Sequence, residues 1–306
     1  MIPQPRAIDV DASRLLKRAA DFVSLGKPRV VSMVLLTTAA GFYLGSQGFV
    51  NYVLLLPALL GTGLAASGTL ALNQYMERDV DALMQRTRQR PLPDGRLQPT
   101  EALLYGAFLT LAGLVYLALA VNPLCALVTA ATTLTYLFLY TPLKRLSPFC
   151  TVVGAVPGAL PPVTGWTAAR GDVHFEAWIL FAILFLWQLP HSLAIARLYR
   201  EDYARGGIRL LPVVEPDARS TGIQAVANTL ALLVVGLLPT AIGMSGGIYF
   251  LAALALGLAF LWYAVAFAWM RTIPSARQLL FASLVYLPVL LLAMTLDKVP
   301  HGILLP

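Results

Sequence analysis

Long apolar segments separated by short polar ones follow one another along almost the whole chain. An apolar run of about 20 residues is long enough to cross the hydrocarbon core of a bilayer as an α-helix. The pattern therefore predicts an all-α polytopic membrane protein, a bundle of nine transmembrane helices. The spans are expected at residues 28–48, 52–76, 100–121, 123–141, 149–168, 174–199, 222–243, 246–270 and 277–296.

The same pattern divides the chain into three parts. Residues 1–27 are basic and have no early apolar run, which favours a cytoplasmic N-terminal segment over a cleaved signal peptide. Within it, residues 12–23 are expected to form an amphipathic helix on the membrane surface. Residues 28–299 form one membrane domain, and residues 300–306 form a short C-terminal tail.

Prolines interrupt the fifth expected span. Pro157, Pro161 and Pro162 lie within it, and each removes a backbone donor from a helix. Irregular backbone at membrane depth is tolerated where protein or a cavity surrounds it. We therefore expect an irregular span that leaves room for a broad, flat ligand, although transporters break helices in the same way.

The distribution of Lys and Arg indicates which side of the membrane each polar segment faces. The chain is 58% hydrophobic with a formal net charge of +7, which by itself could suggest a nucleic-acid partner. With a cytoplasmic N-terminus, however, every Lys and Arg except Arg170 and Lys298 falls in an inner segment. The positive-inside rule then places the C-terminus outside and the chemistry on the cytoplasmic side, with the lipid bilayer as partner and no nucleic acid. Without an Arg/Ser-rich leader, a bacterial cytoplasmic (inner) membrane is expected.

Three oxygen-bearing side chains form a stripe along one helix face where the second span ends. Asn73, Glu77 and Asp81 are spaced i, i+4, i+8, whereas Asp79 points elsewhere. Such oxygen ligands suit a hard divalent cation, with Mg2+ expected and Mn2+ as the alternative. A solvated loop that merely obeys charge topology is the alternative, but ionisable groups on a membrane helix are costly and usually functional.

Basic residues follow this stripe. Arg86 and Arg90 precede Pro91, and guanidinium groups pair well with the phosphates that such a cation carries. Tyr140 and Lys144, with Arg145 beside them, are spaced to reach one anionic group. For this second set, an interface-anchoring Tyr and a snorkelling Lys are an equally good explanation.

A second acidic pair follows the sixth span on the same side. Glu201 and Asp202 end a helix that begins near Trp187, and Arg200 precedes them. Two facing acidic clusters could share one diphosphate through two cations. A chance Glu-Asp pair in a polar loop is the alternative.

His191 lies inside the sixth span, next to Pro190 and four residues after Trp187. A neutral His bonded to a backbone carbonyl freed by the proline is one interpretation. The other is a ligand or general base that faces a cavity.

These segments, taken in order, resemble the UbiA superfamily of intramembrane prenyltransferases, and within it the branch that farnesylates haem. The superfamily motif NxxxDxxxD falls on Asn73, Glu77 and Asp81, with Glu77 at a position usually held by Asp. Its second motif is reduced to Glu201 and Asp202. The matching blocks are residues 25–29, 73–93, 140–145, 157–166, 187–195, 199–208 and 211–214.

The resemblance implies a nine-helix bundle with a central cavity open to the cytoplasmic side. It implies transfer of the farnesyl group of farnesyl diphosphate to a vinyl group of haem b with addition of water, giving haem O for haem–copper terminal oxidases. Asn73, Glu77, Asp81 and His191 would be catalytic. Asn73, Glu77, Asp81, Glu201 and Asp202 would hold Mg2+; Arg86, Arg90, Tyr140, Lys144, Arg145 and Arg200 would hold diphosphate; Trp187 and His191 would contact haem.

Other functions remain open at this point. A related prenyltransferase could act on a quinone or a chlorophyll precursor, but the haem-branch blocks and His191 argue against it. A transporter would be expected to show an inverted repeat, and none is visible. A factor that only delivers haem needs no diphosphate site, so Asn73, Glu77 and Asp81 argue against it. Haem A synthase or the terminal oxidase assembly is a further partner that the resemblance implies.

Overall fold

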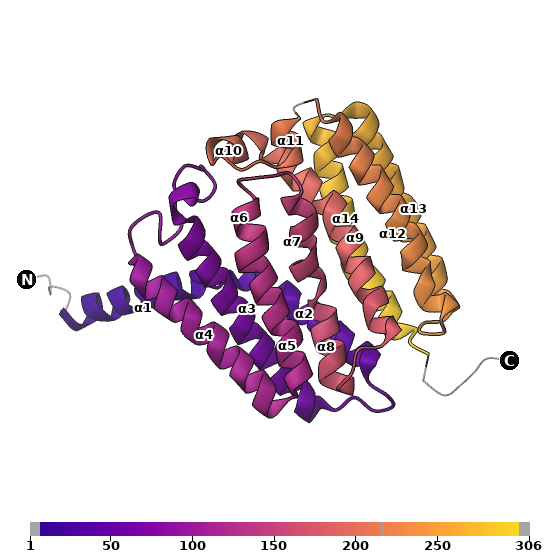
Figure 1. The fold of residues 1–306 in the computed structure, drawn as a ribbon, viewed down its shortest axis with the longest axis horizontal. Coiled ribbons are helices and arrows are strands. Elements are labelled where there is room, and N and C mark those ends of the chain that lie inside the picture. The colour runs from indigo at the N-terminus through magenta and orange to yellow at the C-terminus, as the bar shows by residue number, and fades with distance from the viewer. Residues whose placement is uncertain (1–6, 216, 300–306) are drawn as a thin grey trace, which may run out of the picture.

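The computed structural model describes residues 7–215 and 217–299, and this part of the chain is helical without a β-strand. Figure 1 shows the helices side by side in one bundle. In chain order they are α1 (Ala7–Leu25), α2 (Pro28–Gly45), α3 (Tyr52–Asp81), α4 (Pro99–Ala120), α5 (Pro123–Leu134), the π-helix η1 (Thr135–Tyr140), α6 (Thr141–Leu143), α7 (Cys150–Ala159), α8 (Pro161–Arg170), α9 (Phe175–Leu198), α10 (Arg200–Arg205), α11 (Leu211–Val214), α12 (Arg219–Ala241), α13 (Gly247–Met270) and α14 (Ile273–Leu296).

Eight segments of the described chain are long and apolar enough to cross a membrane, which makes this a multi-pass membrane protein. The fifth predicted span, residues 149–168, is not one of these eight, because it is divided into α7 and α8 of ten residues each. The helix breaks at Leu160 because Pro161 and Pro162 supply no backbone donors. The irregular fifth span is thus confirmed, whereas the count of nine spans is not.

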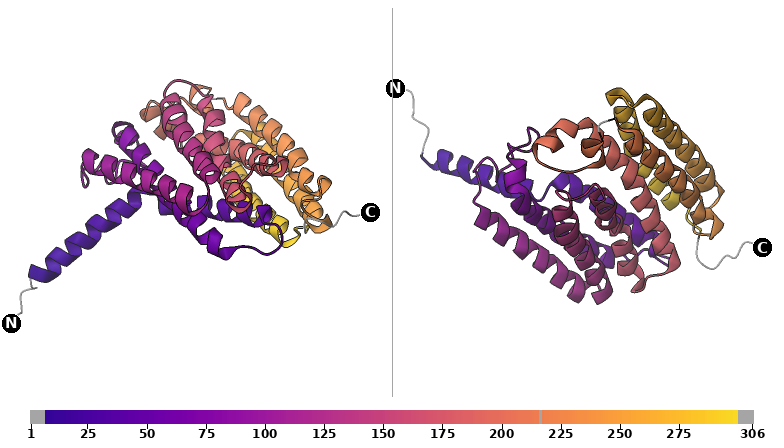
Figure 2. Two further views of the ribbon diagram at one scale, coloured as in Figure 1. Left: turned by 60° about the horizontal axis from the view of Figure 1, so that its bottom comes forward. Right: turned by 45° about the horizontal axis from the view of Figure 1, so that its top comes forward.

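Helix α3 continues to Asp81, five residues past the predicted end of its span, because no helix breaker occurs before the loop. Helix α1 spans Ala7–Leu25, longer than the predicted 12–23, and projects away from the bundle (Figure 2). Its side chains Leu15 and Leu16 are exposed, as a helix resting on a membrane surface requires. The predicted C-terminal tail, 300–306, lies outside the described residues.

Small residues bring neighbouring helices into backbone contact. A Cβ placed on Gly113 of α4 would lie 2.5 Å from the Ala65 amide nitrogen of α3. A Cβ on Gly165 of α8 would lie 1.8 Å from the Thr38 carbonyl oxygen of α2. Such close approach is how membrane helices gain packing energy when lipid and protein are equally apolar.

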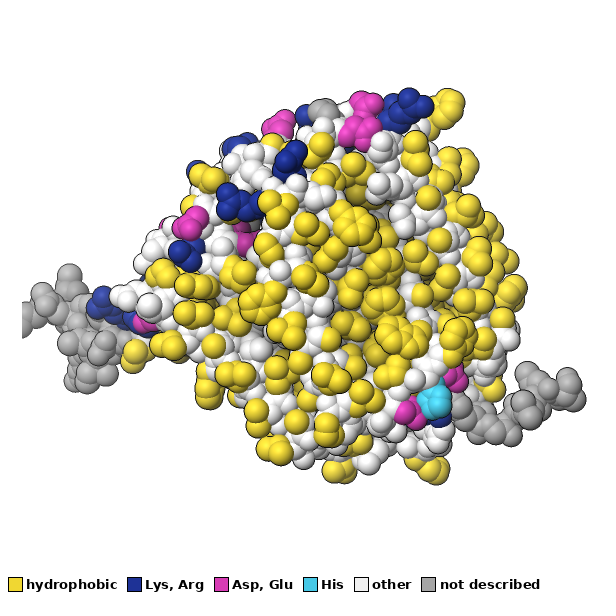
Figure 3. Space-filling model, viewed as in Figure 1, with side chains coloured by type: hydrophobic (Ala, Val, Ile, Leu, Met, Phe, Trp, Pro, Cys, Tyr) yellow, Lys and Arg dark blue, Asp and Glu magenta, His cyan; other side chains and the backbone are white. Residues whose placement is uncertain are grey.

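Charged side chains gather at one end of the bundle. Figure 3 shows Lys, Arg, Asp and Glu along the edge formed by α10, α11 and the neighbouring polar segments, and a broad apolar band below them. The loop 82–98 and the start of α14 belong to this polar end. The fold therefore brings every polar segment that the sequence analysis singled out to one edge of an apolar body.

Candidate functional site

Helix α3 carries the predicted stripe. Asn73 and Asp81 are each 1% exposed, and the Glu77 side chain between them is 14% exposed. Asp79, on the same turn, is 84% exposed, and among the described residues it forms an ion pair with Arg78 alone. The helix periodicity thus separates three inward oxygen-bearing side chains from one solvated carboxylate, as the spacing predicted.

Each member of the stripe meets a cation from a different segment. Lys144 Nζ, after α6, donates to Glu77 Oε1 at 2.8 Å. Arg90, in the loop 82–98, donates to Asp81 Oδ2 at 2.6 Å. Lys27, between α1 and α2, donates to Asn73 Oδ1 at 3.3 Å. The carboxylates and the cations that a metal-bound diphosphate requires are therefore in direct contact here.

The π-helix η1 positions the side chains that face the stripe from the segment 136–144. Thr141 donates to the Tyr136 carbonyl at 2.9 Å across the wide turn, and Asn73 Nδ2 donates to Thr141 Oγ1 at 3.1 Å. Lys144 Nζ lies 4.4 Å from the centre of the Tyr140 ring. Single π turns inside membrane helices often mark functional sites, and this one turns Tyr140 toward Lys144.

Sequence reasoning did not assign Lys27 to the site. Its φ of 48° is the left-handed region, and it ends the turn before α2 with its side chain directed at Asn73. Burial, together with the charges of Arg90 and Lys144, lowers the pKa of Lys27 to about 7. A lysine immediately before Pro28, at the start of a membrane span, is the sequence feature that could have identified it.

The six residues predicted to hold diphosphate lie in three places. Arg90 and Lys144 lie at the stripe, with Tyr140 against Lys144. Arg145 is exposed. Arg86 and Arg200, in contrast, line a separate cavity described below.

The second acidic pair differs from its prediction. Helix α9 begins at Phe175 and ends at Leu198, so Glu201 and Asp202 belong to the short helix α10 and do not end the helix that contains Trp187. The backbone of Tyr199 departs from helical geometry, with φ of −108° and ψ of 25°, and this residue separates the two helices. Glu201 is exposed and Asp202 is buried.

Asp202 fastens α10 to the loop that follows α3. Its Oδ1 accepts from the Gln85 amide at 2.7 Å and from Arg205 at 2.5 Å, and its Oδ2 accepts from the Arg86 amide at 3.2 Å. Burial would raise the pKa of this carboxyl, but these hydrogen bonds outweigh it and leave the pKa below its usual value. The stabilisation is therefore present at neutral pH and is lost as pH falls through the folded pKa.

Asp202→Ala is expected to loosen this loop. Two amides lose a charged acceptor, which costs about 1–3 kcal/mol, so hydrogen exchange at Gln85 and Arg86 should accelerate by about 10- to 100-fold. Exchange mass spectrometry of the detergent-solubilised chain measures this, with Glu201→Ala as the neighbouring control. Unchanged exchange at both amides in Asp202→Ala would contradict the role given to this carboxylate.

The oxygen-bearing side chains of the stripe suit a divalent ion that brings further ligands of its own. In the described chain no three His, Cys, Asp or Glu side chains cluster closely enough to hold a metal by themselves. The stripe offers the two carboxylates of Glu77 and Asp81 and the amide oxygen of Asn73. Mg2+ is commonly held by one or two carboxylates together with substrate phosphates and water. The residues therefore fit an ion that arrives with a diphosphate.

His191 belongs to α9, and its side chain contacts α14. Its Nδ1 is 2.8 Å from Ser283 Oγ, which itself donates to the Leu280 carbonyl at 2.6 Å. Because the hydroxyl has one proton, His191 donates from Nδ1, and its Nε2 carries the free lone pair. Trp187 stacks on the imidazole at 4.8 Å and donates to the Ser283 carbonyl. The partner is thus a side chain and not the backbone carbonyl considered from the sequence.

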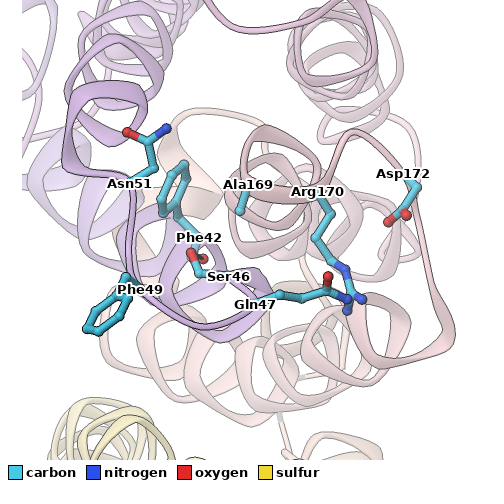
Figure 4. Close-up of a pocket in the computed structure, with 8 residues that line it drawn as sticks. All are labelled: Phe42, Ser46, Gln47, Phe49, Asn51, Ala169, Arg170 and Asp172. Carbon is cyan, nitrogen blue, oxygen red and sulfur yellow. Dashed lines mark hydrogen bonds between the residues drawn. The ribbon is translucent and has the colours of Figure 1, made fainter. Parts of the chain in front are cut away.

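Among the cavities of the described part of the chain, two lie at opposite ends of the bundle. One, of about 710 Å³, is at the polar end between the loop 82–98, the end of α9, α10 and the start of α14. The other, of about 300 Å³, lies between α2 and α8 at the end where Asp172 is located (Figure 4). The smaller cavity contains Arg170 and none of the predicted site residues, so we do not assign the chemistry to it.

The chain matches a known protein family and is similar in sequence to several curated proteins. The UbiA prenyltransferase family matches residues 34–285. The protoheme IX farnesyltransferase of Solibacter usitatus is 49% identical over 91% of this chain and 98% of its own length. That of Koribacter versatilis is 43% identical over 97% and 98%, and that of Aquifex aeolicus is 40% identical over 91% and 95%.

Comparison with solved structures supports the fold. A digeranylgeranylglyceryl phosphate synthase superposes with a TM-score of 0.78 at 16% identity, covering 92% of this chain and 98% of its own. A UbiA homolog from Archaeoglobus fulgidus bound to GPP and Mg2+ gives a TM-score of 0.63 at 16% identity, covering 90% and 99%. At these identities the similarity shows that the bundle is shared.

Proposed function

The chain belongs to the UbiA prenyltransferase family, and we propose that it transfers the farnesyl group of farnesyl diphosphate to a vinyl group of haem b. Water adds in the same conversion, giving haem O and diphosphate. The single observation that carries this proposal is the α3 stripe, with a cation beside each of its oxygen-bearing side chains. The protoheme IX farnesyltransferase relatives support the choice of donor and acceptor.

The chain's own cations hold the diphosphate. Lys27, Arg90 and Lys144 come from three different segments and converge on α3, so together they can surround an anion. When the ligand enters, Arg90 and Lys144 exchange their carboxylate partners, and Lys27 its amide oxygen, for phosphate oxygens through charge-assisted hydrogen bonds. They stabilise the negative charge that builds on the leaving group as the allylic C–O bond breaks.

Asn73, Glu77 and Asp81 would hold the divalent ion at the same place. The oxygens released by the cations are the ligands that Mg2+ prefers. When bound, the ion supplies further stabilisation of charge on the diphosphate oxygens. Exclusion of water is the other task of this site, and the 1% exposure of Asn73 and Asp81 shows how closely packed it is.

His191 would position the acceptor. Ser283 fixes the ring through Nδ1 and leaves the Nε2 lone pair available to the haem iron or to a proton. Trp187, stacked on the imidazole, supplies a flat apolar surface beside it. Both lie in the apolar part of α9, where a porphyrin ring can be desolvated.

The setting of the reaction is also a proposal. We place the N-terminus and the active site on the cytoplasmic side of a bacterial inner membrane, because the basic segments collect at the end that carries the stripe. A handover of the product to haem A synthase or to the oxidase assembly remains a prediction.

The function is tested by supplying the full-length chain, in membranes, with haem b, farnesyl diphosphate and Mg2+, followed by extraction and chromatography of the haems. A new, more hydrophobic haem with the mass expected for the hydroxyethylfarnesyl adduct is the expected result. When farnesyl diphosphate is omitted, the extracted haem should be unmodified haem b. Conversion of a quinone precursor with no change in haem would instead assign the chain to another acceptor.

A further inference from the structure

The cavity of about 710 Å³ at the polar end is the feature that the proposed mechanism leaves unused. Its lining combines four arginines with two carboxylates, and so carries two positive charges in excess. The charged residues are Arg86, Arg197, Arg200, Arg205, Glu201 and Asp202. An excess of guanidinium groups at a membrane surface favours carboxylate or phosphate ligands.

The ion pairs within the cavity lining leave two of its arginines available to bind a ligand. Arg205 is neutralised by Asp202, which also holds the Gln85 and Arg86 amides. The Arg86 guanidinium rests over the rings of Tyr199 and Tyr203 at 5.5 and 5.7 Å. Within the described residues, neither Arg86 nor Arg200 forms an ion pair with a carboxylate. The aromatic rings therefore hold Arg86 in place without satisfying its hydrogen-bond donors.

Helix α9 connects this cavity to His191. Leu198 lines the cavity, and Trp187, His191 and Leu198 are spaced i, i+4, i+11, which places them on one helix face. The seven residues from His191 to Leu198 rise about 10 Å along the axis. That is comparable with the distance from the centre of a porphyrin to the carboxylates of its propionates.

We propose that this cavity binds the two propionate carboxylates of haem, through Arg86 and Arg200, while the macrocycle lies along the Trp187–His191 face of α9. The inference rests on the proposed function, because it places the acceptor of that reaction. It also gives Arg86 and Arg200 a different ligand from the diphosphate predicted from the sequence. The stripe already has three cations for the diphosphate, and these arginines open onto another space.

The anchoring serves the reaction by orienting the ring. Haem has its propionates on one edge and its vinyl groups away from that edge. Holding the carboxylates at the aqueous end of the bundle therefore directs the vinyl groups into the apolar interior, where water is excluded. Two anchored carboxylates and a contact at His191 leave the flat ring little freedom to turn.

The test compares haem b with its dimethyl ester, in which both propionates are neutral. Binding to the full-length chain in detergent is measured by optical titration. We expect the wild-type chain to bind haem b at least about 10-fold more tightly than the ester, since two charge-assisted contacts are lost. The double variant Arg86→Gln, Arg200→Gln should lose this preference while binding the ester and farnesyl diphosphate with Mg2+ unchanged. Arg277→Gln, an exposed arginine at the start of α14 that does not line the cavity, should keep it.

Two results would overturn the proposal. Equal wild-type affinity for haem b and the ester removes propionates as the ligand, whatever the variants do. Loss of farnesyl diphosphate binding in the double variant, with the haem preference intact, assigns these arginines to the diphosphate. Failure of the proposed function is seen separately, as an absence of farnesylated haem from the wild-type chain.

Discussion

Glu77→Gln is expected to lower the kcat/KM of farnesyl transfer by about 10²- to 10³-fold, the usual loss when a group that stabilises transition-state charge is removed. The amide keeps the size of the side chain but removes the charge that pairs with Lys144 at 2.8 Å. It also weakens one of the three oxygen ligands on the α3 stripe. Initial rates measured over a range of Mg2+ concentrations should show both the lower rate and a higher Mg2+ requirement.

Asp79→Asn is the matched control. It removes one carboxylate from the same turn of α3, but its side chain is 84% exposed and lies away from the stripe. The rate should stay close to that of the wild-type chain. Equal rates in Glu77→Gln and the wild-type chain would remove Glu77 from the metal and diphosphate site.

Gly165→Ala is expected to destabilise the bundle by roughly 3 kcal/mol, at the upper end of typical overpacking costs. The added Cβ would lie 1.8 Å from the Thr38 carbonyl oxygen and 2.7 Å from the Phe42 amide nitrogen. Both neighbours are backbone atoms of α2, so no side-chain rotation can relieve the contact. Helices α2 and α8 must separate, and the broken span would lose its support.

The measurement can use the chain's own thiols. Cys125 and Cys150 are both completely buried, so a thiol-reactive dye reports unfolding during a temperature ramp in detergent. Gly63→Ala is the matched control, because a Cβ there lies 3.5 Å from the nearest atom, which is ordinary van der Waals contact. Equal melting temperatures for the two alanine variants would contradict the proposed α2–α8 contact.

Much of the site was predictable because its signal is local. The spacing of Asn73, Glu77 and Asp81 places them on one face of any regular helix, and the absence of a helix breaker lets α3 continue to Asp81. The prolines at 161 and 162 likewise predict a break in any helix that contains them. Apolar runs of sufficient length predict a membrane bundle in the same way.

The pairing of segments distant in the chain was not accessible to such reasoning. Lys27 meets Asn73 across 46 positions, and Asp202 meets the amides of Gln85 and Arg86 across more than a hundred. No periodicity encodes these contacts, since they depend on which helices pack together and on where glycines allow close approach.

The membrane bundle, its polar end and the face shared by the α3 stripe could thus be inferred from the chain alone, because each follows from the period of a helix or the thickness of a bilayer. The bonds between Asp202 and the loop 82–98, and the cavity that Arg86 and Arg200 share away from the stripe, became visible only in the folded chain. Side chains from separate loops acquire their partners only when packing fixes the loops against one another.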